Sequence, residues 1–323
     1  MPTAAQLGGL VLAPLPVMAG AVAYLAHTQA NRLVRPPRTL STHLPSRFGI
    51  GRWEDVKFTT ADGLTLRGWF AAPPQRGGSA VVLAHGTGGH RGHLLPLAGA
   101  LHARGHGVLL FDLRQHGRSD GEVSSFGLHE AEDVLAALAY LRTRPEVAGD
   151  RLALLGHSMG AAASLRAAAR DGGVRAVVSI SCAASLAENV ADGVRALTRL
   201  PAFPLAPLTL WLAQRRARGR VDQMRPIDSV AELRGRPLLL VHGDADRLVA
   251  PHNARRLQGA AEPGTRLIEV AGAGHRSVIG PQHLRAYQDD VLAFLDAHLR
   301  PAPAPTPPYP HHPTGERHDD IYD

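Results

Sequence analysis

The sequence predicts an α/β protein with a mostly parallel central sheet that is covered by helices on both faces. Short, fully apolar segments alternate along the chain with longer segments whose apolar residues recur at helical spacing. A hairpin pattern precedes this alternation and predicts an antiparallel edge beside the parallel strands. The composition agrees with a folded core, because 45% of the 323 residues are hydrophobic and 20% are charged.

The chain begins with an apolar segment. No charged residue occurs in Leu7–Ala26, which is long enough to cross a hydrocarbon core of about 30 Å. Residues 1–6 lack the Lys or Arg that begins a cleavable signal peptide, and Arg32 and Arg35 follow the apolar segment instead. We therefore expect residues 1–30 to be a transmembrane anchor, with the catalytic part of the chain on the cytoplasmic side.

Two prolines leave a second interpretation of this segment open. Pro14 and Pro16 would kink a helix, although membrane-spanning helices tolerate proline better than soluble ones do. The alternative is an apolar helix that packs on the folded domain or lies in the membrane interface. The stretch 31–51 is then expected to be a linker to a folded domain at 52–300.

A hairpin opens the folded domain. Trp53–Thr60 and Leu64–Ala71 fit two strands that are joined at the turn signal Ala61-Asp62-Gly63. Ala80–Ala84 follows as a short, fully apolar strand of the kind found inside parallel sheets.

Strands and helices then alternate to the end of the domain. The expected strands are Gly107–Phe111, Arg151–Leu155, Val174–Ile180, Pro237–His242 and Thr265–Val270. The expected helices are Leu94–Arg104, Leu128–Arg142, Ser158–Arg170, Asn253–Gly259 and His283–Leu299.

Two segments fall outside this alternation. Residues 186–225 contain several prolines and are too long for an ordinary connection, so we expect a small helical cap. Residues 301–323 are rich in proline and then polar, which predicts a disordered tail.

Charge and cysteine content exclude several classes of protein. The net charge is +7, but the basic residues are mostly scattered arginines and only 5% of residues are aromatic, which argues against nucleic-acid binding. The one dense basic cluster, Arg215–Arg220, is expected to be a solvated face or a contact with anionic lipid. Cys182 is the single cysteine, so no intrachain disulfide can form.

The stretch Gly156-His157-Ser158-Met159-Gly160 interrupts an apolar strand and a following alanine-rich helix. It fits the pattern G-x-S-x-G in the strand–turn–helix context that this pattern requires. The glycines leave room for a tight turn in which the serine has an unfavourable backbone conformation. The turn therefore predicts that Ser158 is an exposed nucleophile at the N-terminus of a helix, where a negative charge is stabilised.

A serine hydroxyl needs a base and an orienting carboxylate to become a strong nucleophile. His275 follows the strand at 265–270, and the strand at 237–242 is followed by two carboxylates, Asp244 and Asp246. Asp246 is the expected acid, with Asp244 as the alternative, because loop geometry decides which one reaches the imidazole. Upstream, the strand at 80–84 enters a glycine-rich loop whose N–H groups can face an oxyanion together with that of Met159.

These motifs resemble the α/β-hydrolase superfamily, most closely the serine hydrolases of its Bem46-like and dienelactone-hydrolase-like groups. The resemblance covers roughly residues 53–299 and includes the hairpin turn and Asp112-Leu113-Arg114-Gln115-His116-Gly117-Arg118-Ser119. It implies Ser158 as nucleophile, Asp246 as acid and His275 as base. It also implies that Thr87, which follows His85-Gly86, forms the oxyanion hole with Met159.

The expected function is hydrolysis of a small-molecule carboxylic ester through an acyl-enzyme, without a cofactor. A thioesterase, an amidase or peptidase, or an acyltransferase could use the same residues, and a membrane-tethered binding protein without activity is a further alternative. The histidines form no clean metal pattern, so we expect no metal site. The expected contacts are an acyl substrate and the membrane, and no nucleic acid.

Overall fold

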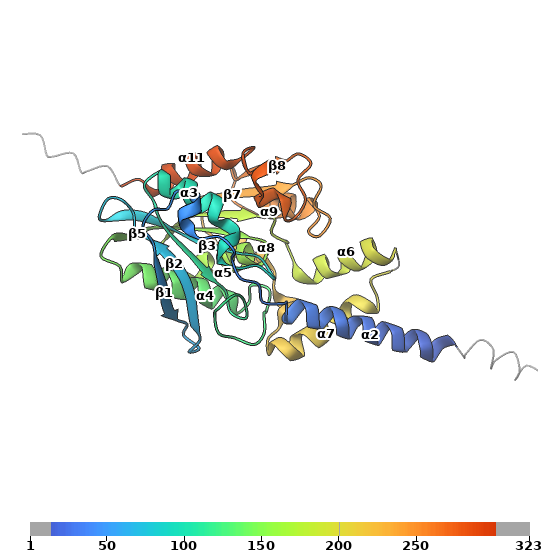
Figure 1. The fold of residues 1–323 in the computed structure, drawn as a ribbon. Helices are drawn as coiled ribbons and strands as arrows, with labels where there is room; N and C mark the ends of the chain where they lie inside the picture. The colour runs from blue at the N-terminus through green and yellow to red at the C-terminus, as the bar shows by residue number, and fades with distance from the viewer. Residues whose placement is uncertain (1–13, 200, 302–323) are drawn as a thin grey trace, which may run out of the picture.

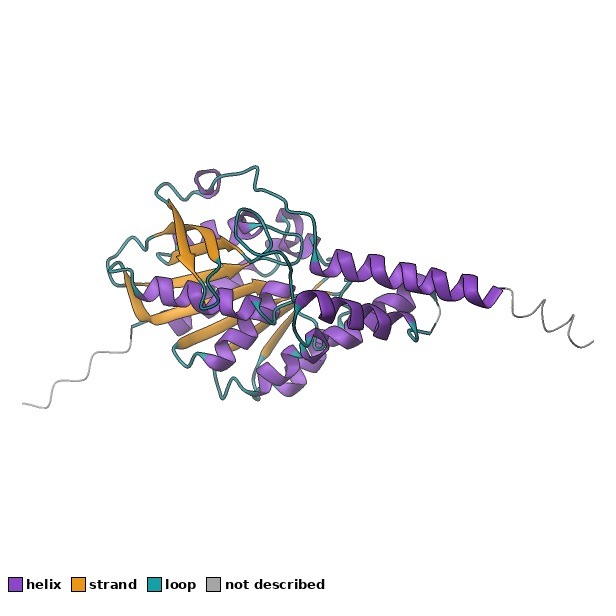
Figure 2. Cartoon of the chain, turned by 90° about the horizontal axis from the view of Figure 1, so that it is seen from below, coloured by secondary structure: helices purple, strands orange, loops and turns teal. Residues whose placement is uncertain are grey.

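The computed structural model describes residues 14–199 and 201–301, and its centre is one eight-stranded sheet in the order β1-β2-β4-β3-β5-β6-β7-β8 (Figures 1 and 2). Strands β3 to β8 are parallel, whereas β2 is antiparallel to both β1 and β4. The predicted fold class is therefore confirmed. The strands are β1 (Glu54–Thr59), β2 (Thr65–Ala71), β3 (Gly78–Ala84), β4 (Gly107–Asp112), β5 (Val147–His157), β6 (Val174–Ile180), β7 (Leu238–Gly243) and β8 (Arg266–Val270).

Helices cover both faces of this sheet. Successive side chains of a strand point to opposite faces, and in β3 Val82 and Ala84 pack in one core whereas Val81 and Leu83 pack in the other. The first core contains side chains of α4 (Glu130–Arg142) and α5 (Met159–Arg170). The second contains side chains of α3 (Leu95–Ala103) and α11 (Gln288–Leu299). The remaining helices of the domain are α8 (Pro226–Ala231), α9 (His252–Ala260) and α10 (Pro281–Leu284).

The segment expected to be a cap contains α6 (Leu186–Thr198), α7 (Leu205–Ala217) and a 3₁₀ turn at Val221–Gln223. The N-terminal helix α2 (Pro14–Val34) lies alongside α7, and together they project from the sheet as an arm (Figure 1). Ala26, Ala30 and Val34 are fully buried at a spacing of four residues, so one stripe of α2 packs against the rest of the chain.

The helix α2 differs from the expected membrane anchor in its limits. It begins at Pro14 and continues past Ala26, while residues 7–13 of the apolar segment lie outside the described residues. Pro14 and Pro16 lie in the first turn of the described part of α2, so the expected kink falls at the edge of the described residues and stays a prediction. Within the described ranges, no helix combines the length and the apolar character that a membrane crossing needs. The expected tail, from residue 302 onward, also lies outside the described residues.

The expected linker, 31–51, is held against the carboxyl edge of the sheet. The Arg38 guanidinium donates hydrogen bonds to the carbonyl oxygens of Gly117, Ser119 and Gly121, at 3.2, 2.6 and 2.6 Å. The Thr39 hydroxyl donates to the carbonyl of Gly88 at 3.1 Å. This segment therefore lies over the loops in which the predicted functional residues occur.

Candidate active site

Ser158 occupies the tight turn between β5 and α5. Its backbone has φ 55° and ψ −118°, a conformation that is strained for a residue with a side chain. Backbone hydrogen bonds hold it there: the Ser158 N–H donates to Ile180 O at 2.8 Å, and its carbonyl accepts from Ala162 N–H at 3.0 Å. The fold thus presents the serine side chain at the carboxyl edge of the sheet.

The glycines around Ser158 are required by close packing. A Cβ atom on Gly156 would overlap the carbonyl of Gly160, and one on Gly160 would overlap the carbonyl of Ala84. A Cβ on Gly86 would lie 3.1 Å from that of Ser158. The steric reason expected for the first two glycines is therefore present, and Gly86 allows the loop after β3 to approach the serine.

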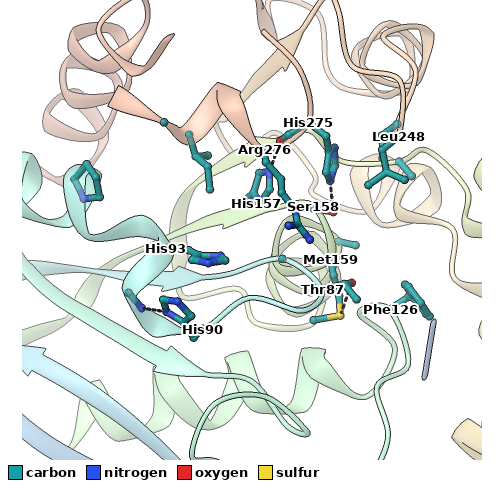
Figure 3. A pocket seen from close by; sticks show the side chains of 18 of the residues that line it. Thr87, His90, His93, Phe126, His157, Ser158, Met159, Leu248, His275 and Arg276 are labelled. Atoms are coloured by element: carbon teal, nitrogen blue, oxygen red, sulfur yellow. Dashed lines mark hydrogen bonds between the residues drawn. The ribbon is translucent and has the colours of Figure 1, made fainter. Parts of the chain in front are cut away.

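Three side chains from distant loops form a hydrogen-bonded chain. The His275 Nε2 lies 2.9 Å from the Ser158 Oγ, and the His275 Nδ1 lies 2.7 Å from the Asp246 Oδ2 (Figure 3). A carboxylate can only accept, so Nδ1 carries the proton and Nε2 can accept the proton of the serine hydroxyl. The structure thus brings together the three residues that the sequence predicts from separate strand ends.

The surroundings of Asp246 keep it ionised. Its Oδ1 accepts hydrogen bonds from the Leu248 and Val249 N–H groups, both at 2.9 Å. Burial alone would raise the pKa of Asp246, but hydrogen bonds from His242 and His275 outweigh burial and hold that pKa well below its usual range. A buried negative charge therefore faces the His275 imidazole.

The alternative acid, Asp244, points elsewhere. Its Oδ1 accepts a hydrogen bond from the Gly272 N–H at 2.7 Å, which joins the loop after β7 to the loop after β8. Of the two aspartates, Asp246 is the one in contact with the imidazole.

Met159 and Thr87, the residues expected to form an oxyanion hole, line the cavity beside Ser158. Met159 is the first residue of α5, so its N–H has no intrahelical acceptor. Thr87 lies in the loop after β3, and its hydroxyl donates to the Met159 Sδ at 3.3 Å (Figure 3). The two expected oxyanion residues are thus neighbours in space.

Two buried histidines hold the loop that contains Thr87. The His85 Nδ1 donates to the Gly86 carbonyl at 2.8 Å, while its Nε2 accepts from the Leu113 N–H at 3.1 Å. The His116 Nε2 accepts from the Gly88 N–H at 3.0 Å. Burial lowers the pKa of both histidines, so both imidazoles are neutral and fix the loop.

Asp112 and Arg114 also fix loops. Asp112 accepts hydrogen bonds from the N–H groups of Arg91 and Arg118, at 2.7 and 3.0 Å. Arg114 forms ion pairs with Asp133 and Asp62, at 2.7 and 2.8 Å. Among the described residues, no group of three or more His, Cys, Asp or Glu side chains could hold a metal ion.

Ser158 and His275 line a cavity of about 830 Å³. One side of it is apolar and is formed by Leu33, Phe126, Met159, Leu186, Val190 and Leu248, among others. Figure 3 shows Phe126 and Leu248 on this side of Ser158, with His90 and His93 on the opposite side. The cap therefore covers a pocket that extends from Ser158 toward the apolar residues on one side and toward His90 and His93 on the other.

Sequence reasoning missed the part that residues 33–48 play in this cavity. Leu33, Ser41, His43, Arg47 and Phe48 all line it, although their segment was expected to be a linker. No motif or periodicity marks these residues, because their place in the cavity depends on a long-range contact with the sheet.

Sequence reasoning also missed Glu130, which is fully buried at the start of α4. Its carboxylate accepts four hydrogen bonds from the turn before the helix, at 2.7 to 2.8 Å: from the hydroxyls of Ser124 and Ser125 and from the N–H groups of Ser125 and Gly127. This turn contains Phe126, so Glu130 fixes one apolar wall of the cavity.

Comparisons with known proteins agree with this geometry. A family model described as serine aminopeptidase, S33, matches residues 78–220. An uncharacterized protein of Mycobacterium tuberculosis is 34% identical over 294 residues, which cover 88% of this chain and 94% of the relative. The polyketide transferase ATR5 of Stachybotrys chlorohalonatus is 27% identical over 291 residues, which cover 76% of this chain and 98% of that protein.

A solved esterase of Pyrococcus furiosus has the same fold, with a TM-score of 0.69 and 25% sequence identity over 83% of this chain and 99% of that one. The family match contains β3, the turn at Ser158 and most of the cap segment, and the structural match covers 83% of this chain. The chain therefore belongs to the α/β-hydrolase superfamily of serine hydrolases.

Proposed function

We propose that this protein hydrolyses carboxylic esters through an acyl-enzyme on Ser158. One observation carries the proposal: a strained serine, hydrogen-bonded through His275 to a buried carboxylate, faces a cavity of about 830 Å³. Such an arrangement activates a hydroxyl that is otherwise a weak nucleophile.

The proposed reaction has two halves. In the first, the His275 Nε2 takes the proton of Ser158 while the Oγ attacks the acyl carbon, and the same nitrogen then gives that proton to the departing alkoxide. In the second, His275 takes a proton from water, the hydroxide attacks the acyl-enzyme, and the proton returns to Ser158 as the acid leaves. Asp246 stabilises the imidazolium that forms in each half.

We propose that the N–H groups of Thr87 and Met159 stabilise the oxyanion in both halves. Both residues line the cavity with Ser158, and the Met159 N–H lies at the positive end of the α5 dipole. Removal of one such donor typically costs about 3 kcal/mol of transition-state stabilisation.

Rival reactions use the same residues. The matching family model is named for an aminopeptidase, and one relative is named as a transferase, so amide hydrolysis and acyl transfer are the strongest alternatives. Ester hydrolysis is favoured because the esterase of Pyrococcus furiosus matches over most of the sheet. Thioester hydrolysis and a role in binding alone are the remaining alternatives.

Hydrolysis of p-nitrophenyl esters with acyl chains of two to sixteen carbons tests the proposal. We expect turnover that depends on chain length and is lost in Ser158→Ala, together with labelling of Ser158 by a fluorophosphonate. Equal background rates in both folded proteins, with no labelling, would contradict the esterase. Release of product that rises with an added alcohol acceptor would instead identify a transferase.

We also propose that the N-terminal segment attaches the enzyme to a membrane whose cytoplasmic face it occupies. Val17, Met18 and Tyr24 of α2 are between 61% and 73% exposed, although α2 carries no charge before Arg32. An apolar surface of this kind is unusual on a protein surrounded by water. The uncharged residues that precede α2 extend its apolar character toward the N-terminus.

A further inference from the structure

Basic side chains line much of the cavity, and Figure 3 shows two of them, His90 and His93, opposite Phe126 and Leu248. Five side chains form what we call the basic side, and they come from three segments that are far apart in the sequence: His43, Arg47, His90, His93 and Arg276. Among the residues that the structure describes, no aspartate or glutamate lines the cavity. An unbalanced group of cations and hydrogen-bond donors beside a reactive serine is suited to an anion.

Within the described ranges, neither Arg47 nor Arg276 forms an ion pair with a carboxylate, whereas arginines such as Arg142 and Arg170 do. The Arg47 Nη1 lies 3.5 Å from the His43 Nδ1, which is also a basic group. Arg276 directly follows His275, and its side chain reaches into the space beside Ser158 (Figure 3). Both guanidinium groups are therefore free to bind an anionic ligand.

His90 and His93 are neutral imidazoles rather than cations. Burial and the charges of His90 and Arg276 lower the pKa of His93 to about 4, and burial also lowers the pKa of His90. The His90 Nδ1 accepts a hydrogen bond from the Gly92 N–H at 3.1 Å, so its Nε2 carries the proton. The basic side thus combines two fixed positive charges with a neutral imidazole N–H.

We propose that the ester substrate carries a carboxylate, which Arg276 and Arg47 bind on the basic side while an apolar group of the substrate lies under the cap. This inference rests on the proposed esterase function and specifies its substrate class. The planar guanidinium suits a carboxylate, because two parallel hydrogen bonds can form. Arg276 is then the main specificity-determining residue, since it lies beside the nucleophile.

Matched pairs of esters test the proposal on either side of the scissile bond. The first pair is the mono-p-nitrophenyl ester of adipic acid and its neutral methyl ester, which place the charge on the acyl side. The second pair is the butyryl ester of 4-hydroxybenzoate and the same ester of methyl 4-hydroxybenzoate, which place it on the alcohol side. The measured quantity is the ratio of kcat/KM for the charged member to kcat/KM for the neutral member.

We expect this ratio to reach about tenfold in one of the two pairs, and to fall as the salt concentration rises. Arg276→Gln and Arg47→Gln should each lower the ratio severalfold, and Arg276→Lys should keep more of it than Arg276→Gln because the charge remains. Arg300→Gln is the matched control: Arg300 is exposed, does not line the cavity, and follows α11. It should leave the ratio unchanged.

The outcomes separate the two proposals. Ratios near one in both pairs, with the neutral esters still hydrolysed in a Ser158-dependent manner, would overturn the carboxylate site and leave the esterase standing. A high ratio that survives in the Arg47→Gln, Arg276→Gln double variant would overturn the assignment to the basic side. If Ser158→Ala hydrolyses all four esters at least as fast as the native protein, both proposals fail together.

Discussion

Asp244 and Asp246 lie two residues apart in one loop, yet they have different neighbours. Asp246 contacts the His275 imidazole, whereas Asp244 accepts a hydrogen bond from the Gly272 N–H. Residue type and position in the sequence do not separate them. The loop folds into a turn in which Asp246 Oδ1 accepts hydrogen bonds from two backbone N–H groups, and this turn sets the direction of each side chain. The difference between the two aspartates is therefore a property of the folded loop.

A pair of substitutions checks this difference. Asp246→Asn should lower kcat on a p-nitrophenyl ester by about 10⁴-fold, because the amide no longer fixes the reactive tautomer of His275. Asp244→Asn keeps an oxygen that can accept from Gly272 and should change kcat by less than about threefold. Steady-state measurement of kcat for both variants tests this prediction. A larger loss in Asp244→Asn would show that the acid has been assigned to the wrong residue.

Glu130 makes a prediction about stability and pH. Burial tends to raise its pKa, but hydrogen bonds from Ser125, Gly127 and Ser124 outweigh burial and lower the pKa from its ordinary value of 4.5. A carboxylate whose pKa is lower in the folded state stabilises the fold above the unfolded pKa. That stability is lost as the pH falls through the folded pKa.

We therefore expect Glu130→Gln to reduce the free energy of unfolding by about 2 kcal/mol at pH 7, because an amide cannot accept all four hydrogen bonds. The difference from the native protein should shrink below about pH 4.5. Urea titrations at several pH values measure it. Glu232→Gln, an exposed position, is the control. A difference that does not depend on pH would mean that the charge of Glu130 is not what stabilises the turn.

At the scale of elements, the apolar periodicity of the chain predicts each strand of the sheet to within four residues. It does not predict α8, and the closing helix expected at His283–Leu299 is divided into α10 and α11. Among the strands, the largest shift concerns β5, which was expected at Arg151–Leu155 and runs from Val147 to His157. Its first residue pairs with Gly78 of β3, so the strand is extended by a neighbour and not by its own composition. The local apolar pattern of the sequence determines that a strand exists, and hydrogen-bonded pairing with the neighbouring strand determines where it begins and ends.

The exposed part of α2 predicts binding to lipid vesicles. The native protein should sediment with vesicles that contain anionic lipid, because Val17, Met18 and Tyr24 expose an apolar surface next to a basic cap. Replacement of Val17 and Tyr24 by aspartate should weaken this binding several-fold. Leu40→Asp is a matched control, since Leu40 is 53% exposed and lies outside α2. Equal binding of all three proteins would show that α2 is not the attachment site.

At the scale of the whole molecule, the N-terminal segment and the hydrolase domain share one cavity. Leu33 lines the pocket, and α2 packs along the cap helix α7. The Arg216 Nη2 of α7 also lies 2.9 Å from the His27 Nδ1 of α2. The segment therefore contributes to the shape of the pocket as well as to the arm.

This arrangement predicts the effect of a truncation. Deletion of residues 1–34 removes the buried Ala26, Ala30 and Val34 and uncovers α7, so the melting temperature should fall by several degrees. The preferred ester chain length should also change, because the wall at Leu33 is lost. Deletion of residues 1–13 alone should change neither property. An unchanged profile in the longer truncation would mean that α2 does not shape the pocket.

The sequence by itself determined the sheet, the turn at Ser158 and the order nucleophile, acid, base, because these depend on periodicity and on glycines within a few residues of one another. Only the tertiary structure decided that Asp246 is the residue in contact with His275, that residues 33–48 line the cavity, and that α2 packs on α7. It also brought His43, Arg47, His90, His93 and Arg276 to the lining of one pocket. These features depend on contacts between segments far apart in the chain, which leave no local pattern in the sequence.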